Sequence, residues 1–192
     1  MSPDVPRAPD ETPSHAPLTV VLDTGAFLRA AINDTNVSSS FLRRAAAGHV
    51  RLCVSHALLE EIRDVLTRPE IRVKNARLSD EALEAFIHEI EATADLFDPV
   101  PERFRYARDP DDEHILNLAI EARAAYILTF DNDLLDLMDS RRAAARTFQE
   151  RFPAITILTP GDMITQLNLL QHQEQVPPGP PASTPEQEPE GA

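Results

Sequence analysis

Four short acidic stretches hold the residues of this chain that could do chemistry. They are VVLD at 20–23, LLEEI at 58–62, DPDDEHI at 109–115 and LTFDNDLL at 128–135. Each places a carboxylate at or near the end of an apolar run. In an open parallel sheet, ligands bind outside the carboxyl ends of the strands. Carboxylates gathered there repel one another without a cation, and Mg²⁺ and Mn²⁺ prefer oxygen ligands. The sequence therefore predicts a metal-dependent site directed at phosphate.

Each stretch also has a purely structural explanation when it is considered alone. An aspartate after a strand or before a helix can be a simple cap, and acids in a first helical turn are favoured by the helix dipole. The joint pattern is harder to explain in this way, because clustered carboxylates raise one another's pKa. Two divalent ions about 3.5–4 Å apart would neutralise such a cluster and support an in-line displacement at phosphorus.

Apolar strands alternate with helices along the chain. We expect strands over 18–23, 50–55, 96–100, 125–130 and 154–158. The intervening patterns predict helices over 26–31, 38–47, the segment that carries Leu58 to Leu66, 79–95, 112–122, 131–138 and 160–170. Such alternation is typical of an α/β domain with a mostly parallel central sheet and right-handed crossovers.

Proline and charge mark two tails around one folded domain. Residues 1–17 and 173–192 are rich in proline and acids, which predicts disorder, and 18–172 form the predicted domain. The net charge is −14. Because nucleic-acid binders are usually basic, this charge argues against tight nonspecific binding, although a metal site can supply local positive charge. The chain has one cysteine, no signal-peptide core and no long apolar stretch, so we expect a cytoplasmic protein without membrane contact.

The ordered set of motifs resembles the PIN domain family. The set is VVLDT, SHALLEEI, DPDDEHILNLA, ILTFDNDLL and ILTP, and it covers about 18–165. The resemblance is closest to bacterial toxin components of type II toxin–antitoxin pairs. It implies a three-layer α/β/α sandwich and an endoribonuclease that uses Mg²⁺ or Mn²⁺ to hydrolyse single-stranded or structured RNA. It also implies an antitoxin partner and a homodimer.

The resemblance assigns the first metal ligands. Asp23 matches the aspartate after the first strand of the family, and Asp112 matches its third acid. Glu61 matches the helical glutamate better than Glu60 does, because an apolar residue follows it directly. Together with Asp131, these residues are the metal ligands that the resemblance implies.

The last acidic motif completes the implied catalytic set. Asp131 and Asp133 match the final acidic pair of the family, and Thr129 matches the threonine before that pair. One position departs from the pattern: family members often have Asn two residues after the first Asp, and this chain has Gly25. The side-chain amide that could orient Asp23 or an attacking water is absent.

Two alternatives stay open at this point. The chain could be a PIN-like binding or regulatory module that does not cleave RNA, or another α/β metal-dependent phosphohydrolase that acts on small phosphoesters. A phosphatase that forms a phospho-aspartate at Asp23 is disfavoured, because Gly25 stands where such enzymes carry a second aspartate. His114, within DDEHI, could have a metal or acid–base role, but we expect it to be an exposed histidine at a helix start. Arg103, Arg105 and Arg108 could guide a phosphate backbone or balance neighbouring acids.

Overall fold

A central sheet of five parallel strands organises the computed structural model, which describes residues 17–174, with side chains to residue 168. The spatial order is β3-β2-β1-β4-β5. The strands are β1 (Leu18–Leu22), β2 (Val50–Ser55), β3 (Asp95–Phe97), β4 (Tyr126–Leu128) and β5 (Thr156–Leu158). The predicted parallel α/β sheet is confirmed. The predicted tails lie outside the described residues, except for Pro17 and the last two residues of the final helix.

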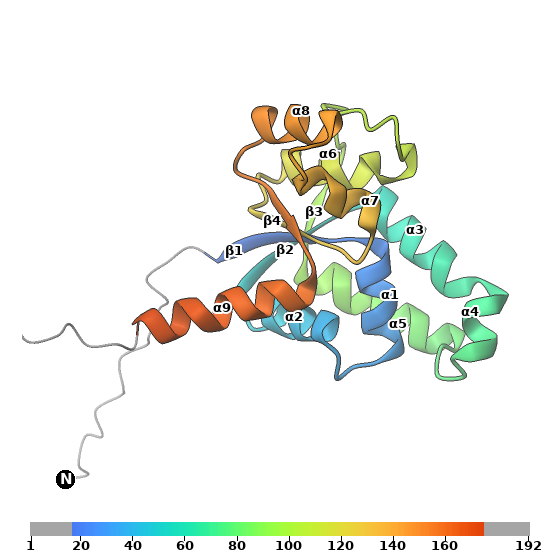
Figure 1. Ribbon diagram of the computed structural model, residues 1–192. Coiled ribbons are helices and arrows are strands. Elements are labelled where there is room, and N and C mark those ends of the chain that lie inside the picture. The colour runs from blue at the N-terminus through green and yellow to red at the C-terminus, as the bar shows by residue number, and fades with distance from the viewer. Residues whose placement is uncertain (1–16, 175–192) are drawn as a thin grey trace, which may run out of the picture.

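Helices cover both faces of the sheet and complete three layers. Figure 1 shows α1, α2, α5 and α9 on one face, with α6 and α8 on the other. The helices are α1 (Thr24–Ile32), α2 (Val37–Ala46), α3 (His56–Thr67), α4 (Pro69–Lys74), α5 (Asp80–Thr93), α6 (Glu113–Glu121), α7 (Asn132–Leu135), α8 (Ala143–Arg151) and α9 (Pro160–Glu174). No helix within residues 17–174 is long and apolar enough to cross a membrane.

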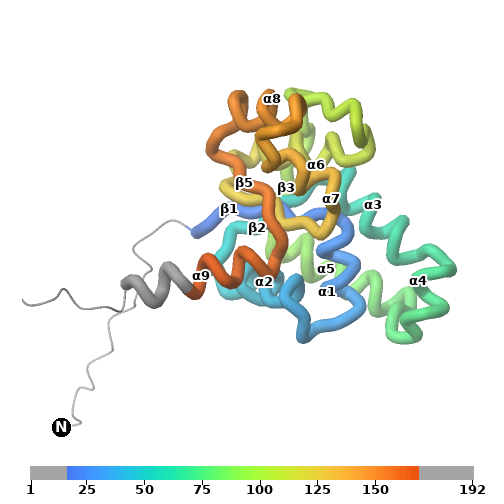
Figure 2. Tube along the Cα trace, in the orientation of Figure 1, coloured from blue at the N-terminus to red at the C-terminus, as the bar shows by residue number. Residues whose placement is uncertain are grey.

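The register of the central strands brings two sequence-distant segments together at one edge. Val20, Val21 and Leu22 of β1 have no exposed surface, as expected for a strand between two sheet neighbours. Leu22 pairs with Leu128 of β4, so the residues that follow these two leave the sheet side by side. The tube in Figure 2 shows α1, α3 and α7 beginning near this edge.

Short polar residues start the helices that leave the sheet. Asp23 caps α1 and Ser55 caps α3, where the serine hydroxyl accepts the Leu58 N–H at 3.2 Å. Asp131 caps α7 by accepting the Asp133 N–H at 2.7 Å. Because a helix leaves its first N–H groups without intrahelical partners, these side chains fix where each helix begins. Two of the three caps are also acids of the predicted site.

Several element boundaries differ from the sequence predictions. Strand β4 ends at Leu128, two residues before its predicted end, and the Thr129 side chain that follows donates to Asp23, directly after β1. Helix α4 begins at Pro69, which stands at the first helical position, where a proline loses no hydrogen bond. Neither α4 nor α8 was among the helices predicted from the sequence.

Candidate active site

The four predicted metal ligands line one pocket at the carboxyl edge of the sheet. Its volume is about 580 Å³. The acids on its wall are Asp23, Glu61, Asp112 and Asp131. They come from the end of β1, from α3, from the turn before α6 and from the end of β4. The structure therefore brings together residues from all four acidic stretches of the sequence.

Asp23 is the most enclosed of these acids, with 6% of its surface exposed. One carboxylate oxygen accepts the Ala26 N–H at 2.5 Å, and the other accepts a hydrogen bond from the Thr129 hydroxyl. Burial raises the pKa of Asp23, and these two hydrogen bonds oppose that rise without cancelling it. Asp23 is therefore held in one orientation at the floor of the pocket.

Thr129 joins the two central strands of the site. Its hydroxyl donates to Asp23 and accepts the Asp131 N–H at 2.7 Å, and none of its surface is exposed. Its backbone N–H donates to the Leu158 carbonyl at 3.0 Å. One side chain thus sets the position of two of the predicted metal ligands.

Glu61 contributes to the pocket and Glu60 does not. The Thr24 hydroxyl donates to Glu61 Oε2 at 2.5 Å, and the same oxygen lies 3.0 Å from His114 Nε2. The contact with His114 is the largest influence on Glu61 and holds its pKa below the usual range. Glu60 is exposed and lies outside the lining of the pocket. The choice of Glu61 over Glu60 agrees with this placement.

His114 takes a larger part in the site than its sequence context suggested. The expectation of an exposed histidine is wrong, since only 26% of its side chain is exposed. Its Nδ1 lies 2.7 Å from the Asp111 carbonyl, and its Nε2 contacts Glu61 as an ion pair rather than as an aligned hydrogen bond. Burial lowers the pKa of His114, but Glu61, the Asp111 carbonyl and the Asp112 carboxylate together outweigh burial, and the net change is upward. The sequence signal that could have indicated this role is the position of His114 two residues after Asp112.

Asp112 carries an oxygen that lacks any partner. Its Oδ2 is buried and makes no hydrogen bond in the structure. Burial, followed by the nearby carboxylates of Asp109, Asp131 and Asp23, raises the pKa of Asp112 to about 7. A buried polar atom without a partner costs free energy, so its presence needs an explanation. A cation that binds this oxygen would supply one.

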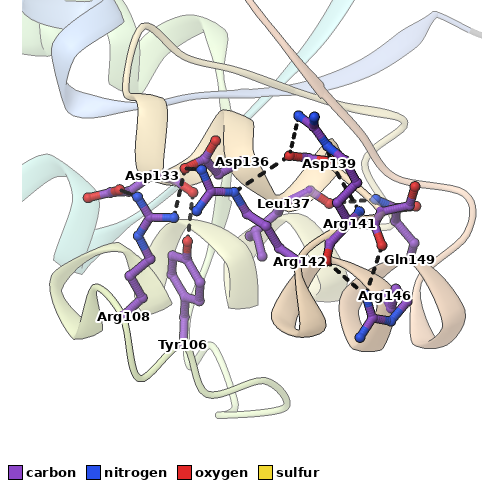
Figure 3. A network of polar contacts seen from close by, with 11 residues as sticks. Tyr106, Arg108, Asp133, Asp136, Leu137, Asp139, Arg141, Arg142, Arg146 and Gln149 are labelled. Carbon is purple, nitrogen blue, oxygen red and sulfur yellow. Dashed lines mark hydrogen bonds and ion pairs between the residues drawn. The ribbon is translucent and has the colours of Figure 1, made fainter.

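Asp133 faces away from the pocket, into a separate network of charges. Its carboxylate lies 2.5 Å from Arg108 Nη2, and its backbone carbonyl accepts the Tyr106 hydroxyl at 2.7 Å. Figure 3 shows Arg108 between Asp133 and Asp136, with Arg142 also against Asp136. Asp133 is thus neutralised by arginine, and its predicted catalytic role stays a prediction without support from its placement.

The three arginines before the acidic turn are all paired. Arg103 contacts Glu121, Arg105 contacts Glu102, and Arg108 contacts Asp133 and Asp136. Of the two explanations offered by the sequence, charge balance fits this arrangement better than phosphate guidance.

Gly25 leaves free space beside Asp23. A Cβ atom at this position would lie 3.6 Å from Asp23 Oδ2, which is an ordinary van der Waals distance. A Cβ atom therefore fits at this position without displacing Asp23. The orientation of Asp23 comes instead from Thr129 and from the first turn of α1.

The donor atoms of the pocket suit a hard divalent cation. They are carboxylate and hydroxyl oxygens, the atoms that Mg²⁺ and Mn²⁺ prefer, and Asp112 offers an oxygen with no competing contact. Within the described residues, no three acidic, histidine or cysteine side chains stand close enough to form a ready-made ligand set. The chemistry of the residues fits a metal, and small side-chain movements would have to complete its coordination.

Comparison with known proteins agrees with the fold. An uncharacterized protein of Methanocaldococcus jannaschii is 28% identical over 127 residues, which is 65% of this chain and 78% of that protein. The profile of the PIN domain family matches residues 19–133, a range that contains all four pocket acids and more than half of the chain. Domains of this family are in general metal-dependent nucleases, which supports a hydrolase of the nuclease class. The sheet order, the acidic pocket and this match together show that the chain belongs to the PIN domain family.

Proposed function

We propose that this protein is a Mg²⁺- or Mn²⁺-dependent endoribonuclease that hydrolyses phosphodiester bonds of RNA. The observation that carries the proposal is the partnerless, buried oxygen of Asp112 in a pocket shared with three other carboxylates. Such a pocket is electrostatically unfavourable when empty, because each ionised acid opposes the ionisation of its neighbours. Binding a cation would reverse that penalty.

Several side chains of the pocket would together hold and position a cation. Asp23, Glu61, Asp112 and Asp131 would hold it, and Thr129 would keep Asp23 and Asp131 in place. When bound, a divalent ion supplies Lewis-acid charge that favours attack of water on a phosphodiester.

The side chains on the pocket wall favour water as the nucleophile. The lining contains no serine or cysteine, and the Thr24 hydroxyl donates to Glu61. The ionised carboxylates of the pocket could accept the proton that an attacking water loses. Hydrolysis without a covalent intermediate is the chemistry that these residues support.

The direct test is cleavage of a labelled single-stranded RNA by the full chain with Mn²⁺, with EDTA, and in an Asp112→Asn variant. We expect cleavage that EDTA and Asp112→Asn both abolish. Asp111→Asn is the matched control, because it makes the same chemical change one residue away at an exposed carboxylate outside the pocket. Cleavage that persists in EDTA, or that Asp111→Asn abolishes as completely, would contradict the proposal.

A phosphomonoester assay separates the enzyme alternatives. Turnover of a small phosphomonoester with RNA left intact would favour another metal-dependent phosphohydrolase. Mn²⁺ binding without turnover of either substrate would favour a binding module of the same fold.

We also propose, from the resemblance to toxins, that the protein is the toxin of a toxin–antitoxin pair and forms a homodimer. An antitoxin with basic side chains would complement the acidic pocket. Growth arrest on expression of the parent chain, absent for Asp112→Asn, would support the toxin role. The mass of the protein in solution would test the dimer.

A further inference from the structure

A second pocket adjoins the acidic one and shares its wall. Its volume is about 420 Å³. Arg29, Ile32 and Phe130 line both pockets, so the two are separated only by these side chains. The rest of its lining comes from the α1–α2 connection and the start of α2. A strand that passes the acidic pocket would reach this one next.

Arg29 is the cationic group at this boundary. Its guanidinium carbon lies 4.2 Å from the centroid of the Phe130 ring, which is a cation–π contact. Among the described residues, none of the ion pairs involves Arg29, whereas Arg103 and Arg108 each contact an acid. Its side chain is exposed, so the N–H groups and the face of the guanidinium turned away from Phe130 are open to a ligand.

Ser38, which also lines the pocket, supplies an independent observation. It has 1% of its surface exposed, and its hydroxyl makes no hydrogen bond in the structure. A buried hydroxyl without a partner is unfavourable unless a ligand satisfies it. Ile32 and Val37 add apolar surface beside it. Apolar walls with a few polar groups are typical of pockets that recognise small planar molecules.

We propose that this second pocket binds one base of the RNA, next to the phosphodiester that is cleaved. The base stacks on the open face of Arg29, the Arg29 N–H groups contact the adjoining phosphate, and the Ser38 hydroxyl bonds the edge of the base. Proteins commonly read unpaired RNA bases by stacking on aromatic rings and arginine planes. The inference rests on the proposed function for its substrate class.

This subsite would also offset the repulsion between the acidic pocket and the phosphate backbone of RNA. A phosphate backbone is repelled by four carboxylates before any cation binds, and the described pocket wall offers only Arg29 as a cation. One stacked base and one arginine contact would hold the strand beside the acids without a broad basic surface.

RNA binding measured in a variant that does not cleave separates the contribution of the subsite from catalysis. The full chain with Asp112→Asn is titrated with Mn²⁺ present against a labelled oligouridylate and an abasic ribose-phosphate oligomer of the same length. We expect Arg29→Ala in that background to weaken oligouridylate binding about tenfold, since one stacked base contributes on this order. The affinity for the abasic oligomer should fall clearly less. Arg29→Lys should recover only part of the oligouridylate affinity, because it restores the charge but not the planar guanidinium group.

Ser38→Ala tests the second contact with a readout that a structural role would not give. We expect its melting temperature to stay unchanged or rise, because it removes a partnerless buried hydroxyl. Its oligouridylate affinity should fall, and the order of preference among the four homopolymers should change. Arg123→Ala is the charge-matched control for Arg29→Ala, since Arg123 is exposed just before β4, at the opposite edge of the sheet.

Equal losses on both oligomers, or a loss for Arg29→Ala no larger than for Arg123→Ala, would overturn the subsite. Lower affinity in Ser38→Ala together with a lower melting temperature would overturn the Ser38 contact. These results do not depend on cleavage. A parent chain that binds RNA through Arg29 but never cleaves it would refute the proposed nuclease and leave the subsite supported.

Discussion

The Thr129 hydroxyl donates a hydrogen bond to Asp23 Oδ2, although 106 positions separate the two residues in the chain. The same hydroxyl accepts the backbone N–H of Asp131. One buried group therefore couples the end of β1 to the end of β4 and sets the geometry between two predicted metal ligands. Replacing this group should affect both stability and chemistry.

Thr129→Val keeps the shape of the side chain and removes its hydroxyl. We expect a loss of roughly 1–3 kcal/mol in the free energy of unfolding, because the Asp23 oxygen and the Asp131 N–H both lose their partner. The pKa of Asp23 should rise further, since Thr129 is the strongest group that opposes the effect of burial. Urea unfolding measures the first effect, and the pH dependence of RNA cleavage measures the second. Thr129→Ser restores the hydroxyl and should recover most of both; recovery of neither would show that the methyl group matters instead.

Asp112→Asn should stabilise the metal-free protein at alkaline pH. The ordinary pKa of an aspartate is about 4, and the pKa of Asp112 is raised to about 7. Between these values the folded protein keeps a proton that the unfolded chain has released, so stability falls as pH rises through this window. The asparagine side chain does not titrate, so the variant lacks this loss of stability.

Thermal denaturation in EDTA at pH 5 and pH 8 measures this effect. The gain in melting temperature of Asp112→Asn over the parent should be larger at pH 8 than at pH 5. Asp111→Asn should show no comparable difference, because that carboxylate is exposed. A gain that is the same at both pH values would rule out a raised pKa at Asp112.

Mn²⁺ should raise the melting temperature of the parent protein. A ligand at 100 times its dissociation constant stabilises the folded state by about 2.7 kcal/mol, which for a chain of this size is on the order of 5–10 °C. The double change of Asp23 and Asp112 to Asn should remove the response. Ca²⁺ serves as a comparison ion that also takes oxygen ligands. If Mn²⁺ does not change the melting temperature of the parent protein, the pocket is not a metal site.

Asp131 and Asp133 should behave differently although they are two residues apart. Asp131 lines the acidic pocket, and Asp133 is paired with Arg108. We therefore expect Asp131→Asn to abolish Mn²⁺-dependent cleavage and Asp133→Asn to retain most of it. Both variants should be checked for folding by circular dichroism, since the Asp131 side chain caps α7. Equal loss of cleavage in two folded variants would show that the Arg108 pair opens during catalysis.

The sequence was sufficient to predict the fold because each buried strand left a local signature. The β-branched run of β1 and the apolar runs of β2 and β4 identify buried parallel strands without any tertiary information. Short elements were harder to place. Phe148 of α8 packs against Phe104, which lies 44 residues earlier in the chain, and a contact between residues so far apart leaves no periodic signal in the sequence.

The site was predictable as a set of acids, but not as a set of contacts. Strand ends and helix starts placed Asp23, Asp112 and Asp131 at one edge of the sheet. Asp133 was predicted as catalytic but not as a metal ligand, and its pairing with Arg108 from another segment could not be read from the local pattern. The contact between His114 and Glu61 was missed for the same reason, as it depends on how α6 packs against α3.

His114 should make Mn²⁺ binding weaker at mildly acidic pH. When protonated, it competes with a cation for Glu61 Oε2, and its raised pKa extends this competition toward neutral pH. In His114→Gln the competing charge is gone. We expect this variant to bind Mn²⁺ severalfold more tightly than the parent at pH 6, and this advantage should shrink at pH 8.5, where less of the parent histidine is protonated. Isothermal titration at both pH values measures the two affinities. His56→Gln is the control, because His56 is mostly exposed and lies outside the acidic pocket. A variant that binds Mn²⁺ more weakly than the parent at both pH values would instead make His114 a residue that orients Glu61 toward the metal.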